Sequence, residues 1–306
     1  MKTLVTGSAG FVGHHLIKHL KDCGDEVSGT DRVEGGPDLK NFSDINKLLK
    51  KAKPEVIFHL AGQADVALSW KDPIETFRTN VEGTVNLLAA AREAGVEKVL
   101  TVTSADIYGS VSATDIPINE NTPFKPVSPY AASKAAADTA SLQAYIGYGQ
   151  NVIRARSFNH LGPGQSDRFV SSAIASQIAK NEKTEQEVIK IGNLKAKRDF
   201  TDVRDVVKAY RLLAEKGKEG EVYNVCSGVA IPILSIAEKL IKLAKKEMRL
   251  EIQKELFRPM EVEILQGDPS LIFRETNWVP EIPLDQTLSD LLNFWRERVL
   301  LEAEAQ

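Results

Sequence analysis

Short apolar runs alternate with longer amphipathic segments along the first half of the chain. The short runs are rich in the aliphatic residues of buried strands, and the longer segments have the spacing of helices that bury one face. Strands that alternate with helices in this way form parallel sheets covered by helices on both faces. The pattern predicts strands at 2–6, 26–30, 56–60 and 98–103, and helices at 11–22, 43–52 and 72–94.

The composition is ordinary for a globular protein. The chain has 306 residues, of which 42% are hydrophobic and 26% charged, and its net charge is -3. The basic runs are short, so we expect no nucleic-acid partner. The two cysteines stand in no metal-spaced cluster, no apolar run is long enough to span a membrane, and no signal peptide is recognisable. We therefore expect a cytoplasmic protein with free thiols, no metal site and no membrane partner.

A glycine-rich turn follows the first strand. Gly7, Gly10 and Gly13 have the spacing G-x-x-G-x-x-G, and the predicted helix begins at Phe11, so Phe11 and Val12 are expected cofactor contacts together with the glycines. The first glycine permits a tight turn, the second lets the backbone approach a pyrophosphate, and the third lets the helix pack closely on the strand. The positive end of the helix then faces the phosphates. The turn predicts a dinucleotide site.

The end of the second strand bears on the choice of dinucleotide. A carboxylate at Asp31 can accept hydrogen bonds from the adenosine ribose hydroxyls, which favours NAD. The neighbouring Arg32 could instead meet the 2′-phosphate of NADP, although Asp31 would repel that group. NAD is favoured and NADP stays open. Further cofactor contacts are expected at Asp38 and Leu39, near the adenine, and at Leu60, Ala61 and Gly62, near a ribose.

The segment 128–134 carries the candidate acid/base chemistry. Ser128 suits a helix N-cap and Pro129 the first helical position, so Tyr130 and Lys134 lie one helical turn apart on the same face. An ammonium beside a phenol is expected to lower the pKa of the phenol, which would let Tyr130 move a proton. A surface Tyr and Lys at helical spacing is the ordinary alternative for the isolated segment.

Two polar residues near the fourth strand extend this set. Ser104 follows the strand, where a side chain faces the crevice in which such sheets bind ligands, and Asp106 comes two residues later. The sequence thus brings Ser104, Tyr130 and Lys134 beside a predicted dinucleotide.

The glycine turn, Ser104 and the Tyr130-x-x-x-Lys134 pair resemble the extended short-chain dehydrogenase/reductase family over essentially the whole chain. The resemblance implies that Tyr130 is the acid/base, that Lys134 binds the nicotinamide ribose, and that Ser104 holds the substrate oxygen. It also implies a homodimer formed by a four-helix bundle, built from the helix at 72–94 and the helix that follows Tyr130.

The second half of the chain is expected to complete two domains. The resemblance implies a Rossmann-type, doubly wound parallel sheet with a smaller C-terminal substrate-binding domain. A strand at 151–156, a helix at 204–216 and a strand at 221–225 are expected in the first, and helices at 233–246 and 287–299 in the second. The expected division is 1–160 with 199–227 for the cofactor domain, and 161–198 with 228–306 for the substrate domain.

Several motifs of the second half resemble the nucleotide-sugar members of that family, most closely the GDP-mannose group. They include the run 158–165 and the segment 198–205. The resemblance implies that Asn159, Arg198 and Arg258 bind the diphosphate of a nucleotide sugar, with Glu261 as a further substrate contact, and guanidinium groups suit phosphate oxygens. Arg198 could instead form a structural ion pair with Asp202 or Asp205.

The reaction is the most open question. The short chain and the run 158–165 resemble reductases, which implies reduction of the C4 keto group of GDP-4-keto-6-deoxy-D-mannose to GDP-D-rhamnose. A 4,6-dehydratase of the family usually has Glu at the position of Asp106. A 4,6-dehydratase or a nucleotide-sugar 4-epimerase therefore remains an alternative, and a non-catalytic dinucleotide sensor a remote one.

Overall fold

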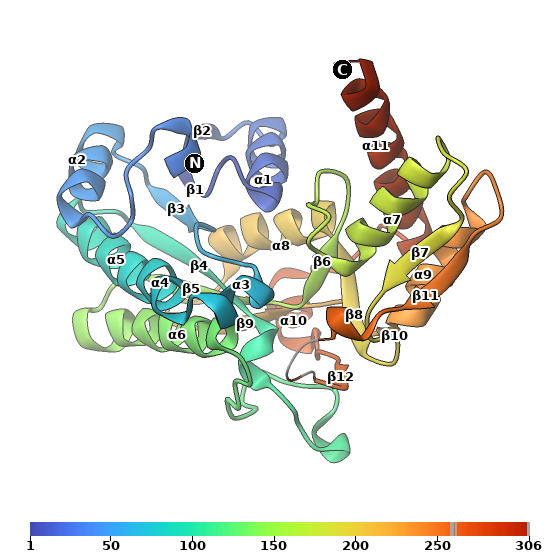
Figure 1. Cartoon of the computed structure of the whole chain (residues 1–306). Coiled ribbons are helices and arrows are strands. Elements are labelled where there is room, and N and C mark those ends of the chain that lie inside the picture. The colour runs from blue at the N-terminus through green and yellow to red at the C-terminus, as the bar shows by residue number, and fades with distance from the viewer. Residues whose placement is uncertain (258–259, 261, 305–306) are drawn as a thin grey trace.

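A six-stranded parallel sheet forms the larger part of the protein (Figure 1). The structure is a computed structural model and describes residues 1–257, 260 and 262–304. The strand order is β2-β1-β3-β4-β5-β9, a doubly wound order in which the chain starts at β1, forms the adjacent edge with β2, and then winds to the other edge. The strands are β1 (Lys2–Thr6), β2 (Glu26–Thr30), β3 (Val56–His59), β4 (Lys98–Ser104), β5 (Val152–Ser157) and β9 (Val222–Val225).

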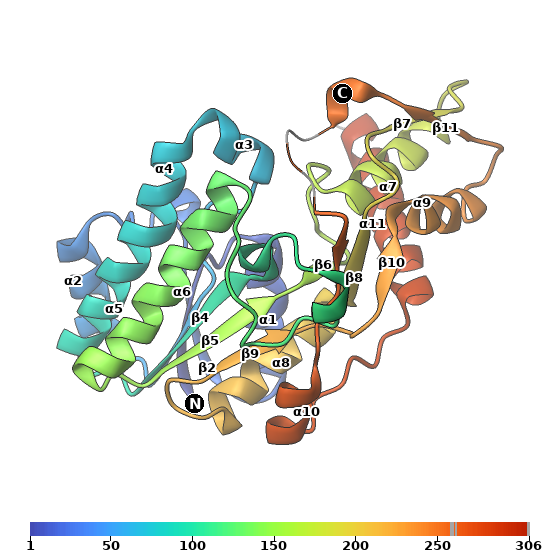
Figure 2. The same ribbon diagram turned by 90° about the horizontal axis from the view of Figure 1, so that it is seen from below.

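Helices cover both faces of this sheet, as Figures 1 and 2 show. One face packs against α1 (Phe11–Asp22) and α8 (Val203–Lys216), and the other against α2 (Phe42–Ala52), α5 (Gly83–Glu93) and α6 (Pro129–Tyr148). The Rossmann-type α/β fold is therefore confirmed, and each predicted strand of the sheet ends within one residue of its predicted limits.

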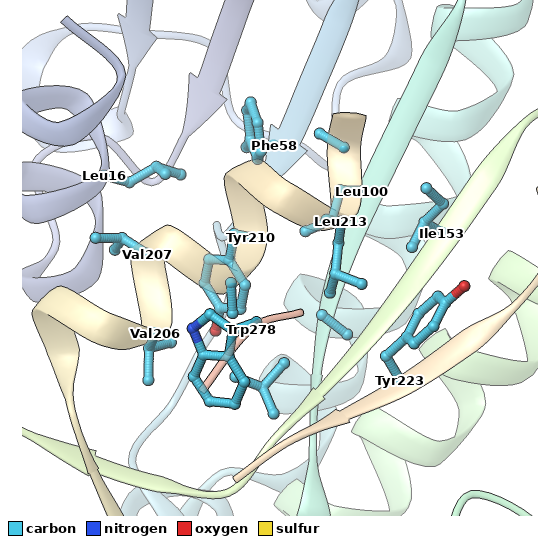
Figure 3. Close-up of a cluster of buried hydrophobic side chains, with 14 of the residues drawn as sticks. Leu16, Phe58, Leu100, Ile153, Val206, Val207, Tyr210, Leu213, Tyr223 and Trp278 are labelled. Atoms are coloured by element: carbon cyan, nitrogen blue, oxygen red, sulfur yellow. The ribbon is translucent and has the colours of Figure 1, made fainter. Parts of the chain in front are cut away.

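The face under α1 and α8 holds a large cluster of buried apolar side chains. Figure 3 shows Tyr210 and Leu213 of α8 packed with Phe58, Leu100 and Ile153 of the central strands. All five side chains are inaccessible to solvent. Burying side chains of this size contributes about 1.5–3 kcal/mol each, so α8 is an integral part of the sheet although it comes late in the sequence.

The single helix predicted at 72–94 is divided in the structure. It consists of α4 (Pro73–Phe77), one π-helical turn (Arg78–Glu82) and α5. The π turn carries Asn80, whose buried side chain accepts a hydrogen bond from Gln63 N at 2.7 Å and donates to Ser133 Oγ at 2.9 Å. The wider turn places this amide against the end of β3 and against α6, which explains the departure from a regular helix.

A smaller set of sheets and helices lies beyond the carboxyl ends of the large sheet (Figure 2). Strand β8 (Lys197–Asp202) pairs with β6 (Asn159–Leu161), β10 (Ala230–Pro232) and β12 (Ile264–Leu265), while β7 (Val188–Ile191) pairs with β11 (Arg249–Ile252). Helices α7 (Val170–Asn181), α9 (Ile233–Lys242) and α11 (Leu284–Glu304) pack with these sheets, whereas α3 (Val66–Lys71) packs against α6 and α10 (Ser270–Thr276) packs against α8 and β9. Helix α9 ends four residues before its predicted limit of 246, and α11 extends beyond 287–299 at both ends.

Candidate active site

A cleft of about 810 Å³ lies between the carboxyl ends of the large sheet and the smaller sheets. This volume lies within the range of small-molecule and cofactor pockets. The cleft is lined by most of the predicted site residues, namely Gly7, Gly10, Phe11, Val12, Gly13, Asp31, Arg32, Asp38, Leu39, Leu60, Ala61, Gly62, Ser104, Asp106, Tyr130, Asn159 and Arg198.

The glycine turn has no space for side chains. Gly7 has a φ of +73°, and a Cβ there would lie 2.9 Å from Ala61 N. A Cβ at Gly13 would lie 2.2 Å from the carbonyl oxygen of Gly7, so the helix packs directly on the turn. The N-cap of α1 is Gly10, which provides no side-chain acceptor for the first N–H groups of the helix. These donors face the cleft and fit the pyrophosphate of a dinucleotide.

The end of β2 presents a carboxylate. Asp31 Oδ2 accepts a hydrogen bond from Ala9 N at 3.3 Å, and Asp31 Oδ1 accepts one from Val33 N at 3.0 Å. Arg32 is largely exposed and its guanidinium lies 3.7 Å from Asp38. The negative charge of Asp31 is therefore fixed at this edge, whereas Arg32 is held only by an exposed ion pair.

Lys134 approaches the end of β3 from α6. Its Nζ donates to the carbonyl oxygen of Val102 at 3.2 Å, and it would lie 3.4 Å from a Cβ at Gly62. Gly62 thus keeps open the space in front of the ammonium, which fits a ribose that needs a hydrogen-bond donor. Burial lowers the pKa of Lys134 to about 8.

Tyr130 stands in the first turn of α6. The Ser128 hydroxyl caps this helix by accepting a hydrogen bond from Ala131 N at 3.1 Å, with Pro129 in the first turn, as predicted. The Tyr130 side chain is buried, and burial, followed by the charge of Asp106, raises its pKa, while the Ser104 hydroxyl opposes the rise. The pKa of Tyr130 is therefore raised and not lowered as predicted, because burial and the charge of Asp106 outweigh the hydrogen bond with Ser104.

The structure describes only some of the predicted substrate contacts. Asn159 begins β6 and Arg198 lies in β8, where Arg198 Nη1 donates to the carbonyl oxygen of Lys197 at 2.9 Å. Arg258 and Glu261, also predicted as substrate contacts, lie outside the described residues.

The two carboxylates suggested as structural partners of Arg198 form other ion pairs. Asp202 lies 2.7 Å from Arg204, and Asp205 lies 3.0 Å from Lys208. The structure shows no ion pair of Arg198 with either of them within the described part of the chain, so the suggested structural pairing is not seen.

Several residues of the cleft wall are not foreseen from the sequence. Arg168 and Phe169 precede α7 and line the cleft, and the Arg168 guanidinium lies 3.7 Å from Asp65 of the opposite wall. Ser157, at the end of β5, lines it as well. The segment 158–165 is marked only by resemblance, and nothing in the spacing of Arg168 or Phe169 marks them as site residues.

The comparisons with known proteins agree with this geometry. The family model described as GDP-mannose 4,6 dehydratase matches residues 35–291. A GDP-6-deoxy-D-mannose reductase from Pseudomonas aeruginosa is 37% identical over 97% of this chain and 98% of the relative. The chain belongs to this family of extended short-chain dehydrogenases/reductases.

Solved structures place the fold in the same family. The structure of RMD from Pseudomonas aeruginosa complexed with NADPH has a TM-score of 0.87 and 35% identity, over 97% of this chain and 100% of that one. The UDP-glucose 4-epimerase of Thermus thermophilus in complex with NAD has a TM-score of 0.88 and 27% identity, over 97% and 99%. The chain is thus an NAD(P)-dependent oxidoreductase of the nucleotide-sugar-modifying class. Among the described residues no helix has the length and apolar character of a membrane span.

Proposed function

We propose that the protein reduces the C4 keto group of GDP-4-keto-6-deoxy-D-mannose and forms GDP-D-rhamnose. The observation that carries this proposal is the match to a GDP-6-deoxy-D-mannose reductase over nearly the full length of both chains. The cleft supports it because Ser104 and Tyr130 both line it, and Lys134 stands beside it.

The glycine turn and Lys134 would hold the dinucleotide, and the chemistry it would supply there is hydride donation to C4. Tyr130 donates its proton to the C4 oxygen, so that the ketone, the hydride and the proton together give a secondary alcohol. Ser104 orients that oxygen by a hydrogen bond. Lys134 holds the nicotinamide ribose, and its ammonium stabilises the phenolate that Tyr130 becomes.

On the substrate side, Asn159 and Arg198 would hold the diphosphate. Both line the cleft, and a guanidinium can bind two phosphate oxygens at once. By resemblance, Arg258 and Glu261 would contact the same substrate. We also propose that residues 1–160 with 199–227 hold the cofactor, while residues 161–198 with 228–306 hold the sugar nucleotide.

For the cofactor, we propose a preference for NADH. Asp31 lines the cleft at the end of β2, where its charge would repel the 2′-phosphate of NADPH. NADPH remains the alternative, because the RMD structure contains it.

The enzyme is proposed to be a homodimer. Exposed apolar side chains occur on α4, α5 and α6, the helices of the expected four-helix bundle, and we propose that they share one face: Ile74, Phe77, Val85, Ile146 and Tyr148. Such a face is typical of an interface between subunits. Both cysteines are free thiols, which suits the cytoplasm, the compartment we propose.

The alternatives depend on Asp106. A 4,6-dehydratase needs an additional acid/base for C5 and C6, and the carboxylate of Asp106 lines the cleft and is near enough to Tyr130 to affect its pKa. A 4-epimerase would use the same Ser104, Tyr130 and Lys134. A sensor without catalysis would have no need of this set.

One assay separates these functions. The pure protein is incubated with GDP-4-keto-6-deoxy-D-mannose and NADH or NADPH, and the sugar formed is identified. The proposal expects oxidation of the cofactor and GDP-D-rhamnose as the product, and no cofactor oxidation would exclude it. Formation of a 4-keto sugar from GDP-mannose alone would show a dehydratase, and inversion at C4 of an unmodified UDP-sugar an epimerase.

A further inference from the structure

Ser157 and Tyr210 form a hydroxyl pair that the proposed reaction does not use. Ser157 ends β5 and lines the cleft, while Tyr210 lies on α8 and is inaccessible to solvent. The two hydroxyl oxygens are 2.5 Å apart. Figure 3 shows Tyr210 within the core on the α8 side of the sheet. A buried phenol therefore supports a serine at the edge of the cleft.

Ser157 lies beside the predicted catalytic serine. The two residues are register partners in the parallel pair of β4 and β5, so Ser104 and Ser157 stand on adjacent strands, whose spacing is about 4.8 Å. Ile153 and Ala155 of β5 both join the core beneath α8, and Ser157 continues this alternation toward the same face. The cleft thus has a second hydroxyl next to Ser104.

The hydrogen bond between the pair has a definite direction. Tyr210 has no other hydrogen-bond partner within the described part of the chain, and neither has the Ser157 hydroxyl. If Ser157 donated to Tyr210, the phenol proton would be buried without an acceptor, which is unfavourable. Tyr210 therefore donates and Ser157 Oγ accepts. The hydroxyl proton of Ser157 is then free to point into the cleft, where it can donate a hydrogen bond to a bound ligand.

The position of Ser157 indicates which acceptor it meets. In a doubly wound sheet the dinucleotide crosses the carboxyl ends of the strands with its pyrophosphate at the first helix. The adenosine then lies toward β2 and Asp31, so the nicotinamide lies toward β4 and β5. We propose that Ser157 donates a hydrogen bond to the carboxamide oxygen of the nicotinamide, and that Tyr210 is the positioning residue for Ser157. This inference rests on the dinucleotide site of the proposed function, not on the identity of the sugar.

A binding measurement tests the contact without turnover. Dissociation constants are measured for NADH and for ADP-ribose, which lacks the nicotinamide, or for NADPH and 2′-phospho-ADP-ribose if those bind more tightly. Ser157→Ala should weaken the reduced dinucleotide about threefold to tenfold and leave the ADP-ribose affinity unchanged. Equal losses for both ligands, or no loss for either, would overturn the assignment. Because no sugar is present, an error in the proposed substrate does not affect the result.

A second test begins with the wild-type protein and an altered dinucleotide. In the thionicotinamide analogue of the reduced dinucleotide, the carboxamide oxygen is replaced by sulfur, a weaker hydrogen-bond acceptor. The wild type should bind the analogue more weakly than the natural dinucleotide, and Ser157→Ala should remove that difference. A wild type that binds both equally, or a difference that survives in Ser157→Ala, contradicts the proposal.

Two further variants distinguish a positioning role of Tyr210 from a nonspecific effect of removing a buried hydroxyl. Tyr210→Phe keeps the packing of the ring but removes the donor to Ser157, so it should give a smaller loss of dinucleotide affinity, again with no loss for ADP-ribose. The control is Ser141→Ala, which removes a fully buried hydroxyl on the opposite face of the sheet, away from the cleft, where it donates within α6 to the carbonyl oxygen of Ala137. If Ser141→Ala discriminates between the two ligands as Ser157→Ala does, the effect is not specific to the cleft.

Discussion

Asp106 follows Ser104 by two residues, and its backbone N–H donates a hydrogen bond to Ser104 Oγ at 3.2 Å. This turn brings the carboxylate to the same end of the cleft as Tyr130, where burial and then Asp106 raise the pKa of the phenol. A raised pKa keeps Tyr130 protonated, which is the state that a reductase needs before it donates a proton. In the proposed reductase, Asp106 would therefore help to keep Tyr130 protonated without taking part in any dehydration.

Asp106→Asn distinguishes a charge that keeps Tyr130 protonated from an acid/base that takes part in a dehydration. Loss of the negative charge should lower the pKa of Tyr130, so the decline of reductase activity in alkaline solution should begin at lower pH. At neutral pH the kcat should remain within about tenfold of the wild type. The measurement is kcat against pH with the 4-keto sugar. A loss of more than about a hundredfold at neutral pH would instead indicate an obligatory acid/base.

Tyr130→Phe should lower kcat by about a hundredfold or more, because it removes the proton donor. The dissociation constant of NADH, measured by fluorescence titration, should change little, since the ring still fills its buried site. Tyr148→Phe is the control on the same helix, where the side chain is 57% exposed and away from the cleft. Turnover that survives in Tyr130→Phe would mean that another group supplies the proton.

Lys134→Met should make the protein inactive yet more stable. Burial lowers the pKa of Lys134 to about 8, so between this value and the unfolded value near 10.5 the unfolded chain binds more protons than the folded one. The free energy of unfolding therefore rises with pH across that window. At neutral pH the free-energy cost of burying the charged ammonium is fully present. The variant should melt roughly 2–5 °C higher near neutral pH.

The gain in melting temperature of Lys134→Met should shrink as the pH rises toward 10, because a neutral lysine amine costs little free energy to bury. Calorimetry at several pH values measures this. Lys180→Met, at an exposed site on α7, should show no such pH dependence. A gain that stays constant with pH would mean that packing, not charge, is responsible.

Asp31→Ser should shift the cofactor preference toward NADPH. The substitution removes the charge that would repel a 2′-phosphate, and leaves Arg32 nearby to attract it. We expect the ratio of kcat/KM for NADPH to that for NADH to rise about tenfold or more. Asp22→Ser, at the end of α1 and outside the cleft, serves as the control. An unchanged ratio would show that Asp31 does not face the adenosine ribose.

Ile146→Glu should weaken the proposed dimer. Ile146 is 73% exposed on α6, and a carboxylate there would have to lose its hydration in a four-helix interface. Light scattering coupled to gel filtration should show a dimeric wild type and a largely monomeric variant. Val279→Glu, at another exposed apolar position, should remain dimeric. A monomeric wild type would refute the interface itself.

Local signals were sufficient for most of the fold. The cap at Ser128, the glycine turn at Gly7 and the short apolar strands depend on residues close in sequence, so they could be predicted and are found in the structure. The same signals could not predict the π turn around Asn80. Its cause is the contact of Asn80 with Gln63 and Ser133, which are distant in sequence and meet only in the folded chain.

The site was predictable only in part for the same reason. Residues at strand ends, such as Ser104, can be placed at the cleft from the sequence because a parallel sheet brings its carboxyl ends together. Arg168 and Phe169 come from a loop before α7, and their place in the cleft depends on how the smaller sheets pack. The pKa of Tyr130 was predicted in the wrong direction because spacing reveals a neighbouring ammonium but not the depth of burial.

The late position of α8 in the sequence has a consequence for synthesis of the protein. Tyr210 and Leu213 cover Phe58, Leu100 and Ile153, yet they emerge from the ribosome well after those residues (Figure 3). Until then, one side of the nascent sheet presents a broad apolar surface to the solvent and to chaperones. The dinucleotide site at the first glycines therefore cannot reach its final stability before more than two thirds of the chain, through residue 225 of β9, has been translated.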